Sequence, residues 1–203
     1  MSTLFVNNLN TASGSTITVP TGKTLVGTDE GAFRVPGAIL QVVQGIVTSA
    51  SAFSIGTGAF SSTLISATIT PKSSSSKILV TGILNGSSDS QSHGFFIALQ
   101  RGSTDIGQGD ANGSRTRVHS GFAQMLQNSD GNNGGGNGAE ILGHGSINFL
   151  DSPATTSATT YNVKVSHNSG GTQTFLLNRT KNDGNASSAP RVSSTLTLME
   201  IAQ

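Results

Sequence analysis

Short runs of apolar residues, most of them alternating with small polar residues, recur from residue 38 to the end of the chain. Residues 39–47 are almost continuously apolar, a pattern that predicts a strand buried on both faces. Residues 64–70 alternate strictly, and so do residues 161–166, as strands with one buried face do. The other predicted strands are residues 77–84, 95–100 with a hairpin return at Ile106, 116–126, 141–150, 175–178 and 195–201. No stretch has a helical period, so the pattern predicts roughly eight or nine strands and no helix.

These strands are short, and Gly, Asn, Ser and Pro separate them. Many short strands with such turns favour a β-sandwich or barrel. We therefore expect residues 38–203 to form an all-β, antiparallel, jelly-roll-like β-sandwich. Hydrophobic residues make up only 34% of the chain, which is lean for a single core, so we expect oligomerisation to supplement it.

Residues 1–37 have a different pattern and form a separate predicted segment. Their β-prone runs are very short, and Pro36-Gly37 marks the boundary with the sandwich. The apolar residues Ile17, Val19, Leu25 and Val26 are too few to offset the entropy lost when this segment orders. We therefore expect residues 1–37 to be an attachment and oligomerisation segment that orders only by docking on another surface, most simply on copies of itself.

Composition and charge exclude several classes of function. The 203 residues contain no cysteine, which excludes disulfides, thiolate metal sites and cysteine catalysis. A formal net charge of +1 gives no electrostatic case for a nucleic-acid partner. We also expect no membrane insertion and no signal peptide, because no long apolar run and no basic stretch followed by an apolar core occurs.

Two motifs resemble ligand sites, and each has a structural alternative. Gly22-Lys23-Thr24 is similar to the end of a phosphate-binding loop, but Ile17 stands where that loop needs glycine. We therefore expect a β-turn there. The histidines are widely spaced and are expected to be ordinary surface or loop residues, although a metal site built by the fold or on a symmetry axis stays open. They are His93, His119, His144 and His167.

The charged residues and serines give no catalytic pattern. Arg115 and Arg117 lie two residues apart, as on one strand face, and we expect a structural ion pair with Asp110 or Asp183 rather than an anion site. No serine stands in a nucleophile elbow, and the scarcity of acids and aromatics argues against a glycan-cleaving enzyme. We therefore expect no enzymatic activity and no cofactor.

Several stretches resemble tail-fibre-like and other virion structural proteins of marine tailed bacteriophages. In the N-terminal part they are GSTITVPTGKTL at residues 14–25, GTD at 27–29 and PG at 36–37. In the β-domain they are PKSSSSKILV at 71–80, RGST at 101–104, GDANGSR at 109–115, FLDSP at 149–153 and TLTLMEI at 195–201. The resemblance implies a trimeric, non-enzymatic particle protein that assembles in the cytoplasm of a host bacterium.

We therefore expect a fibre, tip or knob-like virion appendage that attaches by residues 1–37 and contacts the host surface, a glycan or a protein, through loops. The alternative is a capsid decoration protein that stabilises the shell without binding a receptor. The loops expected to be most exposed are residues 85–94, 127–138 and 182–190. Candidate receptor contacts lie in the second of these loops, which has no apolar side chain from Asn128 to Gly138: Asn128, Asp130, Asn132, Asn133 and Asn137.

Overall fold

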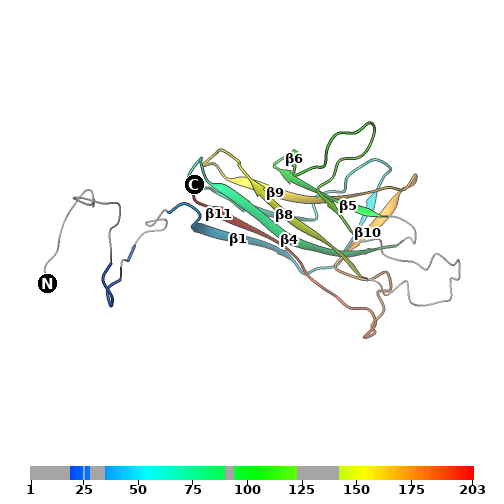
Figure 1. The fold of residues 1–203 in the computed structure, drawn as a ribbon. Coiled ribbons are helices and arrows are strands. Elements are labelled where there is room, and N and C mark those ends of the chain that lie inside the picture. The colour runs from blue at the N-terminus through cyan, green and yellow to red at the C-terminus, as the bar shows by residue number, and fades with distance from the viewer. Residues whose placement is uncertain (1–18, 25, 28–34, 90–93, 123–141) are drawn as a thin grey trace. The chain divides into compact units, whose positions relative to one another are not determined.

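A computed structural model of the chain describes residues 19–24, 26–27, 35–89, 94–122 and 142–203 (Figure 1). The chain divides into two compact units, Met1–Phe33 and Arg34–Gln203. This division lies close to the predicted boundary at residue 37. The described residues contain no helix, and none of them forms a helical segment long and apolar enough to cross a membrane.

The second unit is built from antiparallel strands in two sheets. Sheet A contains β1 (Ile39–Val47), β11 (Ser194–Ile201), β4 (Lys77–Ser88), β8 (Gly143–Asp151), β10 (Gln173–Leu177) and β2 (Ser51–Ile55). Sheet B contains β3 (Ile65–Ile69), β9 (Thr159–His167), β5 (Phe95–Arg101), β6 (Thr104–Ile106) and β7 (Ser120–Gly121). The predicted all-β, antiparallel class is therefore confirmed for the described part of the chain.

One hydrophobic core fills the space between the two sheets. Alternate side chains of β4 and β11 point inward from sheet A, as Val80 and Leu198 do, and Val163 of β9 meets them from sheet B. Phe95 and Phe175 pack edge to face, with their ring centroids 5.2 Å apart. The alternating pattern of the sequence thus places one face of each sheet in the core.

The strand β1 has the predicted bounds but not the predicted burial. Ile39, Val42 and Ile46 are 56–58% exposed, so the prediction of a strand buried on both faces is wrong. The continuous apolar run arises because β1 places apolar residues on its outward face as well as on its inward face. The strand predicted for residues 116–126 is also wrong within the described residues, since only Ser120 and Gly121 are extended and paired.

The chain enters the second unit through a turn that is tied to its last strand. The N–H of Ala38 donates to the carbonyl of Val35 over 3.0 Å, and Gly37 has a φ of 84°. Proline at the second position and a left-handed glycine at the third define a type II turn. The Gly37 N–H also donates to the carbonyl of Ala202 over 2.9 Å. The turn at Pro36-Gly37 is therefore hydrogen-bonded to the residue that follows the last strand, β11.

Candidate functional site

Two buried carboxylates lie in one transverse row of sheet A, at the end where the chain enters the domain. Glu200 of β11 and Asp151 of β8 both pair with Ile78 of β4, one on each side. Glu200 is 0% exposed and Asp151 is 6% exposed. A buried charge is costly unless it is hydrogen-bonded, so the partners of each carboxylate define what this row does.

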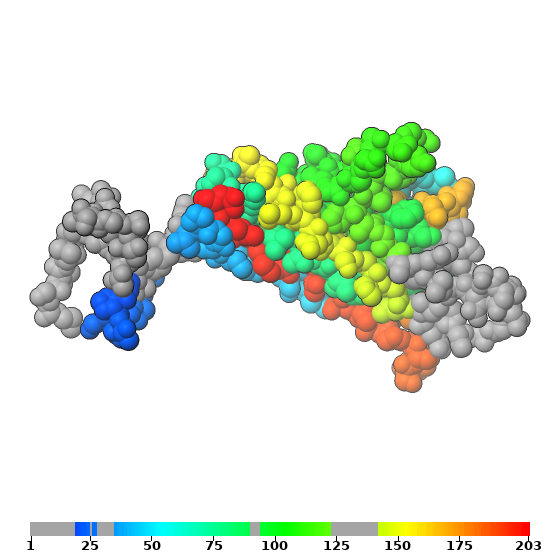
Figure 2. Space-filling model, in the orientation of Figure 1, coloured from blue at the N-terminus to red at the C-terminus, as the bar shows by residue number. Residues whose placement is uncertain are grey.

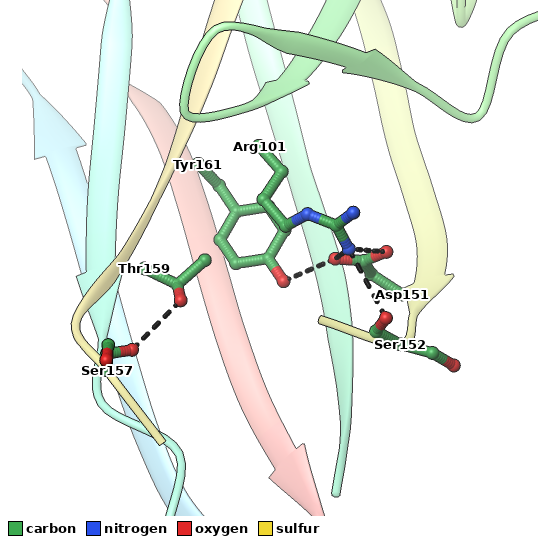
Figure 3. A network of polar contacts seen from close by, with 6 residues as sticks. All are labelled: Arg101, Asp151, Ser152, Ser157, Thr159 and Tyr161. Carbon is green, nitrogen blue, oxygen red and sulfur yellow. Dashed lines mark hydrogen bonds and ion pairs between the residues drawn. The ribbon is translucent and has the colours of Figure 1, made fainter. Parts of the chain in front are cut away.

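Asp151 joins the two sheets through Arg101 and Tyr161 (Figure 3). Arg101 Nη1 lies 2.8 Å from both carboxylate oxygens of Asp151, and the hydroxyl of Tyr161 donates to Asp151 Oδ2 over 2.7 Å. Burial raises the pKa of Tyr161 far above its ordinary value, and the hydrogen bond to Asp151 and its negative charge raise it further. The phenol therefore stays protonated and acts as a fixed donor.

Glu200 ties the segment between β3 and β4 to the sheet. Its carboxylate accepts from Gln41 Nε2 over 2.6 Å and from the N–H of Lys72 over 2.7 Å. Burial alone would raise the pKa of Glu200, but hydrogen bonds from Gln41 and from the backbone of Lys72 and Ser73 outweigh it and lower the pKa. Glu200 therefore stays ionised and holds this end of the domain together.

Glu200, Tyr161 and Arg101 were not among the site residues predicted from the sequence, although one signal was available. In residues 195–201 the inward positions are Leu196 and Leu198, so the same alternation places Glu200 in the core. A charged residue at an inward position predicts a set of hydrogen-bond donors around it. Asp151 anchors the two sheets through Arg101 and Tyr161.

Within the described residues no group of three potential metal ligands gathers, and two histidines have structural partners. His119 Nδ1 lies 3.1 Å from the Gly107 carbonyl, and its Nε2 accepts from Asn148 over 3.3 Å. His167 Nε2 lies 2.9 Å from the Ile55 carbonyl. Both rings therefore fasten segments of backbone. His144 is exposed on β8, and His93 lies outside the described residues.

The ion pairs expected for Arg115 and Arg117 are wrong. Both residues lie in the segment between β6 and β7 rather than on a strand. Arg115 donates to Asn112 Oδ1 over 2.7 Å, and Arg117 Nε donates to the Gly109 carbonyl over 2.8 Å. Asp183 instead pairs with Arg179 and Arg191, which flank its own loop. The guanidinium groups of Arg115 and Arg117 therefore stabilise the surface loop between β6 and β7.

The strand register places the ends of the predicted contact loops together, at the end of the domain opposite the carboxylate row. Gly86 of β4 pairs with Gly143 at the start of β8, and Ser88 pairs with Phe175. The segments that leave these strands are residues 89–94, 122–142 and 178–193. Residues 85–88 belong to β4, so the loop predicted from residue 85 begins later than expected. The side chain of Asn85 is bound to the Ser193 carbonyl over 2.6 Å.

The buried Asn178 fixes the base of the loop that contains residues 182–190. Its side-chain amide donates to the carbonyls of Val47 and Ser49, and its Oδ1 accepts from the Ser194 hydroxyl over 2.7 Å. Its φ of 58° is a left-handed conformation that asparagine tolerates. One buried side chain thus joins β1, β10 and β11 beneath an exposed loop.

The remaining predicted site residues fall partly outside the described part of the chain. Val19 and Val26 are 43% and 72% exposed, whereas Ile17 and Leu25 lie outside the described residues. All five candidate receptor contacts, Asn128, Asp130, Asn132, Asn133 and Asn137, also lie outside them. The expected turn at Gly22 is confirmed, because Lys23 donates to the Pro20 carbonyl over 3.0 Å and Gly22 has a φ of 77°.

No family model matches this chain, and no curated protein matches it.

Proposed function

We propose that the chain is a non-enzymatic structural protein of a tailed-bacteriophage particle, in the class of a tail fibre, tip or knob. It forms a homotrimer that attaches to other virion proteins by residues 1–37. Residues 38–203 are a jelly-roll-like β-sandwich that it presents to the host surface. It assembles in the cytoplasm of the host bacterium and then remains on the virion.

The observation that carries this proposal is the opposite placement of two features along sheet A. At one end the chain enters through the Val35–Ala38 turn, beside Ala202. At the other end Gly86, Gly143 and Ser88 lie where three loop segments leave the sheets. A domain fixed at one end and bearing loops at the other suits an appendage, because recognition residues concentrate on loops held by a rigid scaffold.

The anchored carboxylates support the same arrangement. Stretches that resemble virion proteins supply Arg101, Asp151 and Glu200, and these residues fasten the end nearest the chain entry. An attachment end has to transmit force from the particle to the domain. Charge-assisted hydrogen bonds between buried groups are the strong ones in proteins, so this is the end where they are of most use.

Labelling of the protein on purified particles tests the proposal. Gold-conjugated antibodies against residues 38–203, viewed by electron microscopy, are expected to bind at the tail or its fibres. Labelling spread evenly over the capsid shell would overturn the appendage assignment in favour of a decoration protein. Absence of label from particles, with the protein present in infected cells, would overturn both assignments.

A further inference from the structure

Exposed apolar side chains concentrate on one face of the domain. The described residues include eight large apolar side chains that are exposed. Five of them project outward from sheet A: Ile39, Val42, Ile46, Ile83 and Leu150. The other three precede β1 in the chain: Val19, Val26 and Val35.

The strand register assembles the outward residues of sheet A into rows across β1, β11, β4 and β8. One row places Val42 beside Met199, Leu79 and Leu150. A neighbouring row at the chain-entry end pairs Ile39 with Ile201. On the other side a polar row, which includes Gln44 and Thr197, separates these residues from Ile46 and Ile83. We call these outward positions of the four strands the apolar face; Figure 2 shows these strands as adjacent bands, with β1 blue and β11 red.

The outward side of sheet B differs from the apolar face. Ser66 and Thr68 of β3 are exposed, and Thr68 shares a 2.7 Å hydrogen bond with Thr160 of β9. Asn162 donates to the Gly102 carbonyl over 2.9 Å. An antiparallel sheet with one solvated face normally carries polar residues there, as sheet B does on these two strands. Sheet A therefore departs from the expected pattern, and an exposed apolar patch of this kind marks an interaction surface.

The chemistry of the apolar face narrows the choice of partner. Among its outward positions, Lys77 is the one lysine, arginine or carboxylate, His144 carries an imidazole ring, and none is Phe, Tyr or Trp. Phosphate groups need several cations, and sugars are bound by stacking on aromatic rings and by dense hydrogen bonding. Aliphatic rows that carry almost no charge are complementary to rows of the same kind, and a second copy of this chain supplies them.

The area of the apolar face also bears on the partner. With strands about 4.8 Å apart and a rise of about 3.3 Å per residue, the face from Ile39 to Ile46 covers roughly 450 Å². Two such faces bury roughly 900 Å² together, which places a contact between two copies among the weak interfaces below ~1,000 Å². The polar row of Gln44 and Thr197 lies inside this area. The face therefore suits a weak, reversible contact between copies.

We infer that the apolar face is the surface through which copies of this chain pack against one another, with the outward sides of β1, β11, β4 and β8 turned towards each other. The inference rests on the homo-oligomer of the proposed function and names its contact surface. It is independent of where on the virion the protein lies.

Single cysteines test this assignment in the purified full-length chain, because the natural sequence has none. Val42→Cys places a thiol on the apolar face, and Ser66→Cys places one on the exposed outward side of sheet B as the matched control. In the assembled protein a maleimide reagent is expected to modify position 42 at least tenfold more slowly than position 66. Dilution until light scattering reports a monomer is expected to remove the difference.

A second pair of variants tests the energetics. Val42→Thr combined with Ile46→Thr keeps β-branched side chains on β1 and removes apolar area, whereas Ser66→Thr is the control on sheet B. The double variant is expected to raise the dissociation constant of the oligomer at least tenfold, as measured by sedimentation, with its circular dichroism spectrum unchanged. The control is expected to assemble like the parent chain.

Three results would overturn the inference. The parent chain could remain a monomer at every concentration, which would also remove the oligomer from the proposed function. Position 42 could react as fast as position 66 in an assembled protein, which would leave the oligomer but move its surface elsewhere. Protection of position 42 at a monomeric mass would mean that the chain's own N-terminal segment covers the face. Particle labelling decides the virion assignment separately.

Discussion

At the scale of single residues, a few polar side chains inside the core determine how the two sheets meet. Tyr161 and Arg101 approach from sheet B, and Asp151 approaches from sheet A. Tyr161 is 0% exposed, so water cannot replace its hydrogen bond. Buried polar groups reduce the stability of the fold little when all of them are hydrogen-bonded, but strongly when one loses its partner.

Tyr161→Phe is expected to lower the free energy of unfolding by about 1.5–3 kcal/mol, the range for a hydrogen bond to a charged group. The ring still fills its place, so the fold is retained while Asp151 loses one donor. Urea unfolding followed by circular dichroism measures the loss. Thr68→Val, which removes an exposed hydroxyl from sheet B, is the control and is expected to cost less than 1 kcal/mol. A Tyr161→Phe variant as stable as the parent chain would contradict the anchoring role.

The buried, ionised Glu200 is expected to make the stability of the domain depend on pH. Its pKa is lowered from 4.5 in the folded state, so its contribution is fully present above pH 4.5 and is lost as the pH falls through the lowered folded-state value. Glu200→Gln is expected to cost about 1–3 kcal/mol at neutral pH and to flatten the loss of stability in acid. Urea midpoints measured from pH 7 to pH 3 test this.

The control for this pH series is Asp110→Asn, which changes an exposed carboxylate. It is expected to leave the acid-induced loss of stability as steep as in the parent chain. If Glu200→Gln showed the same slope as the parent chain, the ionised Glu200 would not be what links stability to pH.

At the scale of elements, β1 of sheet A and β3 of sheet B approach each other closely at Gly45. A Cβ at Gly45 on β1 would clash with the carbonyl oxygen of Ser66 on β3. The two strands approach this closely because Gly45 has no side chain, which is a reason for glycine within an otherwise apolar strand.

Gly45→Ala is therefore expected to destabilise the domain by about 1–3 kcal/mol, the usual cost of overpacking. Gly56→Ala is the matched control, because a Cβ there meets nothing within 4 Å. Thermal unfolding of the two variants is expected to show a clear drop in melting temperature for the first and almost none for the second. Equal stability of both variants would mean that β1 and β3 separate without cost.

At the scale of the whole molecule, the boundary between the two units suggests where the chain can be cut. The second unit starts at Arg34, and the turn at Val35–Ala38 is bonded to Ala202. A cut after Phe33 keeps that turn, whereas a cut after Gly37 removes part of it.

Deletion of residues 1–33 is expected to leave a folded β-domain with its unfolding midpoint nearly unchanged and to abolish its incorporation into particles. Circular dichroism measures the fold, and immunoblotting of purified particles measures incorporation. Normal incorporation of the truncated chain would show that attachment does not depend on this segment.

Deletion of residues 128–138 tests the predicted contact loop. This stretch has no apolar side chain, so its removal is expected to shift the melting temperature little. Binding of the protein to host cells is expected to fall at least tenfold, because loss of one weak contact is repeated in every copy of an oligomer. Ser66→Thr, which changes an exposed mid-strand position of sheet B, is the control. Unchanged binding after deletion of 128–138 would favour a decoration protein.

The sequence alone was enough to predict the antiparallel, all-β class and the approximate positions of most strands, because a period of two in apolar residues directly reflects the geometry of a strand. It also predicted the turn at Gly22, since this turn depends on the backbone preferences of adjacent residues. Local chemistry was sufficient for these features.

Only the tertiary structure decided features that depend on residues far apart in the chain. The periodicity of the sequence could not predict that the apolar outward residues of β1 are exposed, because their burial depends on whether another part of the protein covers the outward face of sheet A. It also could not pair Asp151 with Arg101 and Tyr161, since strand order brings these residues together across the core. The apolar face arises in the same way, from the register of four strands rather than from any one of them.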